Sequence, residues 1–364
     1  MTNYYLNLPT SGSYNWTTAA IWSTNTNGSS PAATPPGSGD NVYPSAAITS
    51  GATLVVDATA NCNNFDMTAN GGLSVTMTLS LGNQFLNIYG SLTMNSNFVD
   101  STTDGGTGEY YFTGTGTQNL TTAGVVIYHR IFMAGSGTLN FLGNITMGAN
   151  GSNNIYLYSG TMNTNNNNIV FNAYSGNFNI SGNQTRILNL GSSTISFDAL
   201  SGGWLTTPTT NLTFNAGTST INYAYSSFDG GGLTYNIVNL TGSTCTITGS
   251  NTFTTLSFQP SATQTITFTD GTTQTVTNFT GTNGTNVITM QGSGTAGWYL
   301  TESGGGIVSM DYLALSYSNA SPSTLTWYAG THSTNTIGNT GWIFTAPPAA
   351  AIGCVLPLGF VKGH

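Results

Sequence analysis

The sequence predicts an all-β fold, a parallel β-helix in which short strands coil around one continuous core. Three observations lead to this prediction. Only 4% of the residues are charged, against about 25% in ordinary soluble domains. The polar remainder is mostly Thr, Ser, Asn and Gly, and apolar residues alternate with it at a period of two. These alternating runs recur at short intervals along the chain, which is typical of a solenoid.

The alternating runs read as strands because each is bounded by a turn that contains Gly, Asn or Ser-Gly. No long window places apolar residues at the i, i+3, i+4, i+7 spacing of a helix. The first two runs look like one structural unit used twice. The clearest runs are FLNIYGSLTM (85–94), TLNFLGNITM (138–147), NIVFNAYSGNFNI (168–180), NLTFNAGTSTINY (211–223) and QTITFTDGTTQTVTNF (264–279).

The runs repeat at roughly 18 to 29 residues, which is the length expected of one solenoid coil. Each coil would contribute two or three strands, with Leu, Ile, Val and Phe inward and Thr, Ser and Asn outward. Tandem β-sandwich domains remain the alternative, because Gly-containing turns also suit hairpins. The repeat is seen in runs that start near Ile169, Ile187, Leu212, Ile237, Ile266, Val287 and Ile307.

Both ends of such a stack need caps, because the terminal coils would otherwise expose unpaired strand edges. We expect an N-terminal cap or attachment segment over residues 1–45, the β-helix body over 46–320 and a C-terminal cap over 321–345. The tail, 346–364, is apolar and broken by prolines, so we expect it to contact a partner or another copy of the chain. The cap residues are predicted to be Trp16, Trp22, Trp327, Tyr328, Trp342 and Phe344.

The charge balance excludes several classes of partner. Three basic and 11 acidic residues give a net charge of −8, so the chain lacks the basic footprint that nucleic acids or anionic lipids require. No apolar stretch reaches the ~18 residues of a membrane span, and the N-terminus does not resemble a secretion signal. The three cysteines are far apart, and no motif for a metal or cofactor occurs, so we expect no disulfide framework, metal or cofactor.

Carboxylates are the first candidates for chemistry, because glycoside hydrolysis needs two of them about 5 to 9.5 Å apart. We expect these scattered acids to cap turns instead, and we predict no catalytic residue. The adjacent His129 and Arg130 are expected to make polar contacts with a loop or a neighbouring subunit. The carboxylate groupings are Asp57 with Asp66; Asp100, Asp104 and Glu109; and Glu302 with Asp311.

The segment WYAGTHSTNTIGNTGWIF (327–344) combines aromatic residues with a single histidine, His332. No carboxylate or second histidine lies within the segment to form a catalytic or metal-binding pair. We therefore predict that it plugs the last coil, with its glycines letting the chain turn across the end.

Aromatic residues give a second type of candidate site. Exposed Tyr and Trp rings stack on sugars, but the same residues also pack in cores and subunit contacts. The candidates for a glycan-binding or subunit contact are Tyr110, Tyr111, Tyr156, Tyr158, Trp204, Tyr223 and Tyr225.

The stretch 186–344 resembles the Gly/Thr/Asn-rich β-helical repeats of bacteriophage tail-fibre and virion surface proteins. The resemblance implies a non-enzymatic fibre, spike or capsid-surface decoration of a virion, acting in host attachment as a homotrimer beside other virion proteins. A polysaccharide-degrading tail spike and a bacterial surface adhesin remain alternatives. The resemblance is carried by RILNLGSSTISF, NLTFNAGTSTI, GGGLTYN, TITGSNTF, TDGTTQTVTNF, SMDYLALSYSNA and WYAGTHSTNTIGNTGWIF.

Overall fold

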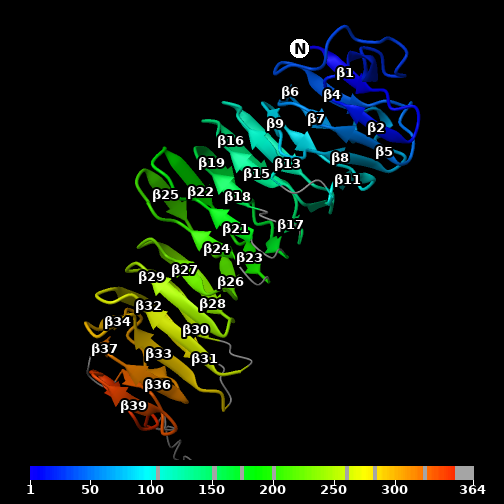
Figure 1. The fold of residues 1–364 in the computed structure, drawn as a ribbon. Helices are drawn as coiled ribbons and strands as arrows, with labels where there is room; N and C mark the ends of the chain where they lie inside the picture. Colours follow the sequence, from blue (N-terminus) through cyan, green and yellow to red (C-terminus); the bar gives the residue numbers. More distant parts are fainter. Residues whose placement is uncertain are drawn as a thin grey trace, which may run out of the picture.

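The chain forms an elongated stack of coils, with β-strands lying across its long axis (Figure 1). This computed structural model describes residues 1–103, 107–149, 154–172, 176–198, 202–258, 262–281, 285–322 and 326–348. Sheets of parallel strands run along the stack, which confirms the predicted parallel β-helix. The described helices are the 3-10 turns η1 (Ala19–Ile21) and η2 (Ala69–Gly71), and no described helix is long and apolar enough to cross a membrane.

The longest sheet, sheet C, has 13 strands and extends along most of the stack. Its strands, in spatial order, are β6 (Ala60–Cys62), β9 (Phe85–Ile88), β12 (Glu109–Phe112), β15 (Arg130–Met133), β18 (Ile155–Leu157), β21 (Gly176–Asn179), β24 (Gly202–Leu205), β27 (Ser227–Asp229), β29 (Thr244–Thr248), β31 (Gln264–Phe268), β33 (Ile288–Gly292), β36 (Leu313–Ser316) and β39 (Thr334–Ile337).

Sheet A runs from the N-terminal end of the stack to Asn215, and sheet B covers only the first coils. Sheet A contains β3 (Trp22–Ser23), β1 (Asn3–Leu6), β4 (Asn41–Pro44), β7 (Phe65–Asp66), β10 (Leu92–Thr93), β13 (Thr117–Thr121), β16 (Thr138–Phe141), β19 (Gly160–Asn163), β22 (Arg186–Asn189) and β25 (Leu212–Asn215). Sheet B contains β2 (Gly12–Asn15), β5 (Ala52–Val55), β8 (Met77–Ser80) and β11 (Phe98–Asp100).

Sheet D begins at Val126 and extends toward the C-terminal end, where sheet E lies. Sheet D contains β14 (Val126–Ile127), β17 (Ile145–Met147), β20 (Ile169–Phe171), β23 (Thr194–Phe197), β26 (Thr220–Tyr223), β28 (Thr234–Leu240), β30 (Thr252–Phe258), β32 (Thr273–Gly281), β34 (Trp298–Glu302) and β37 (Ser318–Ser321). Sheet E contains β35 (Val308–Ser309), β38 (Trp327–Tyr328) and β40 (Trp342–Ile343).

The coil length agrees with the interval predicted from the sequence. Phe228 pairs with Ile247, which is 19 positions further along the chain. Phe178 pairs with Trp204, which is 26 positions further along. Parallel partners elsewhere lie 15 to 28 positions apart, and the first coil is longer, with Asn3 paired to Asn41 and Gly12 to Ala52. Loops between the strands take up these differences, so equivalent side chains still stack into columns.

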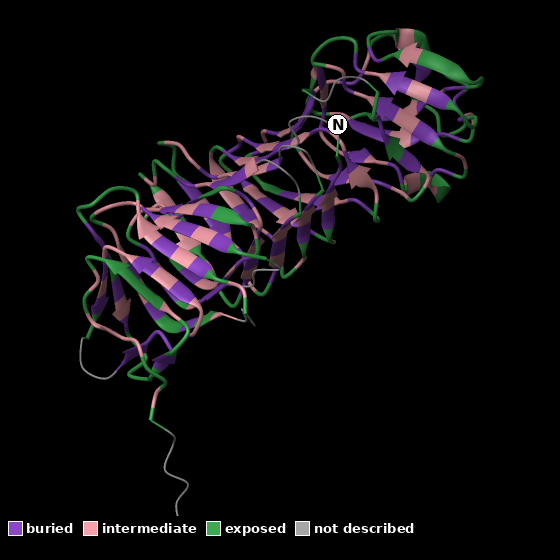
Figure 2. Cartoon of the chain, turned by 60° about the horizontal axis from the view of Figure 1, so that its bottom comes forward, coloured by how far each residue is buried: buried purple, intermediate pink, exposed green. Residues whose placement is uncertain are grey.

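The core is built from these columns. Along most strands, buried and less buried residues alternate, as the burial colouring shows (Figure 2). On sheet C, Ile155, Phe178, Trp204 and Phe228 occupy successive coils in register, and all four side chains are buried. Removing such columns from water is the main stabilising contribution, at about 25 cal/mol per Å² of apolar surface.

The two runs FLNIYGSLTM and TLNFLGNITM share a form but not a location. Each is a strand, a corner and a second strand, but the prediction that they are one structural unit used twice is wrong. The first run joins β9 of sheet C to β10 of sheet A, whereas the second joins β16 of sheet A to β17 of sheet D. The same sequence pattern therefore makes different corners of the coil, because either corner only requires two short amphipathic strands.

The long strands β28, β30 and β32 each serve two faces. β26 pairs only with the second half of β28, and β34 pairs only with the first half of β32. These three strands therefore connect the preceding coils to the last coils, which contain β34 and β37 of sheet D and β35, β38 and β40 of sheet E.

The N-terminal end is covered by a strand of opposite direction. β3 pairs antiparallel with β1, while the other strand pairs in the described residues are parallel. Trp16 and Trp22 are buried, with ring centroids 4.7 Å apart, and the Trp22 indole N–H donates to the Trp16 carbonyl at 2.8 Å. Residues 1–45 also include β1 and β2, so this segment contributes strands of the first coil as well as cap residues.

The C-terminal end is packed by aromatic rings. Trp327 is fully buried and lies in register with Trp342, with ring centroids 5.2 Å apart. The Trp342 indole N–H donates to the Ser318 hydroxyl at 2.9 Å. Tyr328 is buried, and Phe344 is half-buried against the core. Most of the predicted partner-contact tail, residues 349–364, lies outside the described residues.

Candidate functional site

The seven predicted contact residues separate into two groups. Tyr111, Tyr156 and Tyr158 lie at the surface of sheet C. The other four are 0–2% exposed and belong to the core, which corrects their prediction as surface contacts, since a buried ring cannot stack on a ligand. The core group is Tyr110, Trp204, Tyr223 and Tyr225.

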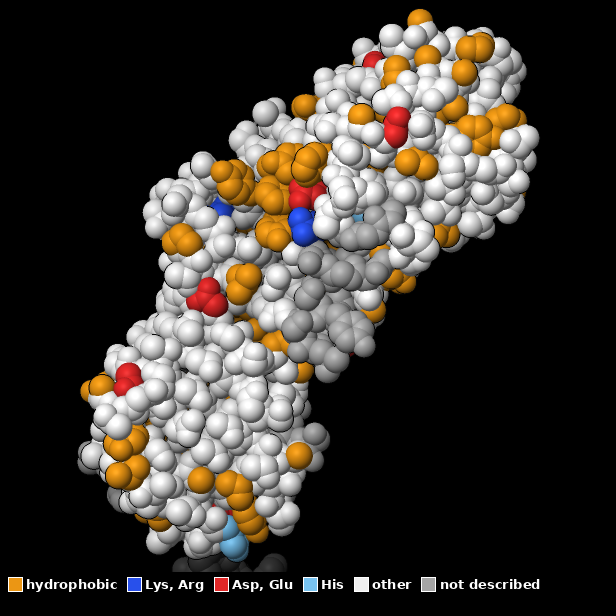
Figure 3. Space-filling model, viewed as in Figure 1, with side chains coloured by type: hydrophobic (Ala, Val, Ile, Leu, Met, Phe, Trp, Pro, Cys, Tyr) orange, Lys and Arg blue, Asp and Glu red, His pale blue; other side chains and the backbone are white. Residues whose placement is uncertain are grey.

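The three surface tyrosines belong to a larger cluster, which we call the aromatic face: Phe85, Tyr111, Phe132, Tyr156 and Tyr158. Tyr111 stacks on Phe132 with ring centroids 4.8 Å apart, and Phe132 lies 5.0 Å from Tyr156. Phe85 and Tyr158 lie at the edges of the cluster, 5.8 Å from Tyr111 and 6.0 Å from Phe132. Figure 3 shows hydrophobic side chains gathered near the middle of the molecule beside an acidic and a basic group.

Coil register places these rings side by side. Tyr111, Phe132 and Tyr156 are direct partners on β12, β15 and β18. Sequence reasoning missed Phe85 and Phe132, although a signal was present. Each lies at an alternate, outward position of a strand in which Leu86 or Ile131 faces the core.

An ion pair borders the aromatic face. Glu109 and Arg130 are register partners, and the Arg130 guanidinium lies 3.3 Å from the Glu109 carboxylate. Burial raises the pKa of Glu109, while the hydrogen bond and charge of Arg130 act in the opposite direction. Burial, followed by the charge of Glu109, also raises the pKa of Tyr111.

Behind this surface lies a buried polar cluster centred on Asp100. Its carboxylate accepts hydrogen bonds from the Tyr110 hydroxyl at 2.6 Å and from the His129 backbone N–H at 3.1 Å. The His129 ring Nδ1 lies 2.7 Å from the same carboxylate, and both side chains are fully buried. His129 and Arg130 therefore contact different carboxylates on opposite sides of sheet C, and do not form a joint site.

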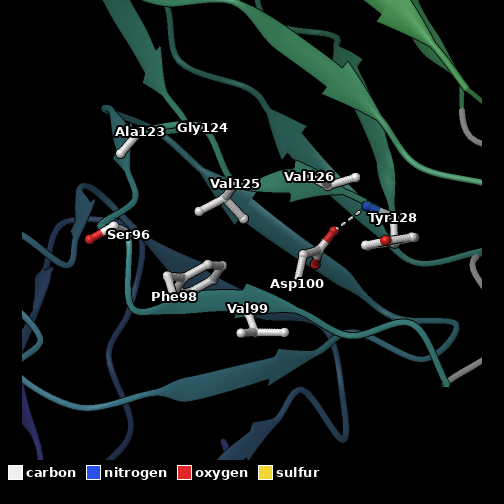
Figure 4. Close-up of a pocket in the computed structure, with 9 residues that line it drawn as sticks. All are labelled: Ser96, Phe98, Val99, Asp100, Ala123, Gly124, Val125, Val126 and Tyr128. Atoms are coloured by element: carbon white, nitrogen blue, oxygen red, sulfur yellow. Dashed lines mark hydrogen bonds between the residues drawn. The ribbon is translucent and has the colours of Figure 1, made fainter.

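A pocket of about 330 Å³ opens next to this cluster (Figure 4). Phe98, Val99 and Val125 are among its lining residues, and Asp100 accepts a hydrogen bond from the Tyr128 backbone N–H at 2.6 Å. Because Asp100 is occupied by protein donors, it anchors the wall of the pocket and presents no open carboxylate there.

A second pocket, also of about 330 Å³, adjoins the aromatic face. It begins at Ser159, the residue after Tyr158, and lies where β18 of sheet C turns into β19 of sheet A. Most of its lining residues carry a hydroxyl or amide group, although the larger part of the lining surface is apolar. The lining residues are Ser136, Ser159, Gly160, Thr161, Gln184, Thr185 and Ile187.

The predicted carboxylate groupings do not share a strand face. Asp66 lies on sheet A and Asp57 follows a strand of sheet B, while Asp100 and Glu109 lie on sheets B and C. Glu302 accepts hydrogen bonds from the backbone of Gly305 at 2.8 Å and of Gly304. Asp104 lies outside the described residues.

His332 does have a carboxylate partner, but from outside its own segment. The His332 ring Nδ1 lies 2.8 Å from Asp311, whose carboxylate also accepts the His332 backbone N–H at 2.8 Å. Burial acts to raise the pKa of Asp311, but these hydrogen bonds outweigh it and hold the pKa below its usual value. The prediction of an unpartnered histidine considered only residues 327–344, whereas the coil brings in Asp311 from one turn earlier.

Metal and thiol chemistry find little support in the described part of the chain. No three His, Cys, Asp or Glu residues gather there in a way that would hold a metal ion. Cys62 and Cys245 are buried free thiols, and burial raises the pKa of Cys245 to about 12. A buried thiol that stays protonated is a poor nucleophile and a poor metal ligand.

Comparisons with protein-family models, curated proteins and solved structures give no match.

Proposed function

We propose that this chain is a non-enzymatic structural protein of a bacteriophage virion, a β-helical fibre, spike or capsid-surface decoration that acts in host-surface attachment. The observation that carries the proposal is an exposed aromatic face on a stiff, charge-poor solenoid. Contiguous exposed apolar side chains mark interaction sites on soluble proteins. Parallel strands stacked around one core form a shaft that holds this face at a distance from either end.

The carboxylate environment supports a structural role over polysaccharide cleavage. A glycosidase needs an acid and a second carboxylate that both reach the scissile bond. Here Asp100 is engaged by Tyr110, His129 and Tyr128, and Glu109 by Arg130. Incubation with capsular polysaccharide from the host should accordingly release no new reducing ends and no unsaturated sugars. Release of either product would favour the alternative of a polysaccharide-degrading tail spike.

The assembly we propose is a homotrimer, joined to other virion proteins through the N-terminal segment or the apolar tail. Symmetric association buries surface that a narrow solenoid leaves exposed. Light scattering on the purified protein should give three times the chain mass of 37.8 kDa. A monomer at all concentrations would exclude self-association as part of the proposal.

Location in the particle is the direct test. Gradient-purified phage particles should contain this chain by mass spectrometry, and antibodies against it should label intact particles in electron micrographs. A chain found only on the surface of uninfected bacteria would instead identify an adhesin. These results do not depend on which ligand the aromatic face binds.

A further inference from the structure

The aromatic face has the geometry of a ligand-binding surface. Phe85 is 40% exposed and Tyr158 is 47% exposed. The face spans β9, β12, β15 and β18, which corresponds to about 14 Å along the axis at the ~4.8 Å spacing of neighbouring strands. The Tyr156 hydroxyl accepts a hydrogen bond from the Asn154 amide at 2.8 Å, which fixes that ring in place.

The orientation of the rings determines what they offer a ligand. The Tyr111 and Phe132 planes are inclined by only 17°, so these two rings cover each other's faces. Their edges, which carry the positive part of the ring quadrupole, attract oxygen atoms. Phe85 is inclined by 65° to Tyr111, and Tyr158 by 36° to Phe132. Phe85 and Tyr158 therefore present more ring surface to aliphatic C–H groups.

A carbohydrate combines these two requirements, since each sugar has aliphatic C–H groups on one side and hydroxyl oxygens around its rim. The hydroxyl and amide side chains of the adjoining pocket, among them Thr161, Gln184 and Thr185, supply hydrogen-bond partners at the Tyr158 end. The pocket volume of about 330 Å³ falls within the usual range for small-molecule sites, about 300 to 1,000 Å³.

Charge narrows the ligand class to neutral sugars. Arg130 is the basic residue at the face, and Glu109 lies against it at 3.3 Å. A polyanionic chain would meet the negative charge of Glu109 and little positive charge to balance it. The solenoid as a whole carries a net charge of −8, which would also repel an acidic polymer.

We propose that the aromatic face and the adjoining pocket bind a neutral carbohydrate chain that lies along the solenoid axis. The proposal rests on the role in surface attachment and specifies its ligand class. The ring ladder repeats at 4.8 and 5.0 Å, so successive rings meet successive parts of an extended chain. Tyr158 lies at the edge of the ring ladder, and the residue that follows it, Ser159, lines the pocket.

Affinity electrophoresis through gels that contain a soluble polysaccharide tests this proposal. The probes are dextran, galactomannan and a mixed-linkage β-glucan as neutral chains, with hyaluronate as an acidic chain. At least one neutral chain should retard the protein, and hyaluronate should not. Tyr158→Ala and Phe85→Ala should each weaken retardation about tenfold, which corresponds to the loss of one aromatic contact.

Matched controls separate binding from folding. Tyr299, on β34, is 42% exposed and lies outside the aromatic face. Tyr299→Ala should leave retardation unchanged, and Tyr158→Phe should retain most of it because the ring remains. All variants should give the circular dichroism spectrum and thermal unfolding of the parent protein.

Three results of the affinity electrophoresis would overturn the proposal. They are the absence of retardation by all neutral chains, equal retardation of the Tyr158→Ala variant, and stronger binding to hyaluronate. Light scattering tests whether the face is instead a contact between copies of the chain. If the Phe85→Ala/Tyr158→Ala double variant dissociates an oligomer, the face is a contact between copies and the carbohydrate assignment fails. The chain would still be found in phage particles in each case if the proposed function is right.

Discussion

Asp229 shows how single residues hold neighbouring coils together. Its carboxylate accepts hydrogen bonds from the backbone N–H groups of Thr206 at 2.8 Å and Thr207 at 2.7 Å, one coil earlier. It also accepts a hydrogen bond from the Thr248 hydroxyl at 3.0 Å, one coil later. Burial acts to raise the pKa of Asp229, but these hydrogen bonds outweigh it and lower the pKa below its usual value. Asp229 therefore connects three coils.

We predict that Asp229→Asn lowers the free energy of unfolding at pH 7 by about 1–3 kcal/mol, since an amide cannot accept all of these hydrogen bonds. A folded-state pKa below the unfolded value of about 3.9 means that the carboxylate stabilises the fold above that pH. This contribution is lost as the pH falls through the folded-state pKa. Urea unfolding between pH 2 and pH 7 should show that the difference in free energy of unfolding between variant and parent becomes smaller as the pH falls.

The exposed Asp198 serves as the control, and Asp198→Asn should change stability little at any pH. If the free-energy difference between Asp229→Asn and the parent stays constant across the pH range, the charge of the carboxylate is not the cause of the destabilisation.

Neighbouring residues in one strand also show where sequence reasoning stops. The alternation in the strand that contains Tyr110 and Tyr111 predicts that their side chains face opposite sides of the sheet. It does not say which of the two faces inward. The structure buries Tyr110 on Asp100 and leaves Tyr111 on the aromatic face. That choice depends on the inward neighbours supplied by other coils, here Leu86 and Ile131.

At the scale of elements, asparagine side chains form a ladder along the outside of sheet A. Each donates its amide N–H to the asparagine one coil earlier, from Asn140 onto Asn119 at 3.2 Å to Asn215 onto Asn189 at 2.6 Å. Asn163 and Asn189 continue the series between them. Neutral amides can stack at the strand spacing without the repulsion that like charges would suffer. The ladder gives a physical reason for the low charge of the chain.

We predict that Asn189→Ala lowers the free energy of unfolding by about 1–2 kcal/mol, because it removes two ladder hydrogen bonds that are partly open to water. Thermal unfolding followed by circular dichroism would measure the change. Thr213→Ala, at an exposed position on the adjacent β25, is the matched control and should have a smaller effect. Equal effects of the two substitutions would contradict a specific role for the ladder.

The individual strands were the part of the fold that the sequence predicted best. Runs such as 264–279 became a pair of strands, β31 and β32, because alternation and glycine turns act locally. The sheet to which each strand belongs could not be predicted. Similar runs such as 85–94 and 138–147 form different corners, since their local sequences satisfy either one.

At the scale of the whole molecule, each coil contacts mainly its two neighbours. Stability is then close to a sum of coil and interface contributions, and one end can loosen while the other remains folded. The aromatic packing of Trp327 with Trp342 and Phe279 is the main ring cluster at the C-terminal end of the described coils.

We predict that Trp342→Ala destabilises the C-terminal coils by about 2–3 kcal/mol, because Trp342 is a half-buried ring that also donates to Ser318. Amide hydrogen exchange should rise in β33 to β40 and stay unchanged in β1 to β20. Tyr299→Ala is the exposed aromatic control. Unchanged exchange in the C-terminal coils would show that the Trp342 ring does not plug the stack and would return the segment to consideration as a binding site.

The sequence by itself determined the fold class, the approximate length of most coils and the aromatic residues at the two ends, because alternation, turn residues and recurrence are local properties of the chain. Only the tertiary structure decided which aromatic rings are exposed and which side chains meet. Tyr111, Phe132 and Tyr156 share one face, and His332 contacts Asp311, because coils of 21 and 24 residues bring these distant positions into register. That register depends on the length of each individual coil. Each length is fixed by the corner loops and by inward packing against other coils, and no single run of sequence specifies these contacts.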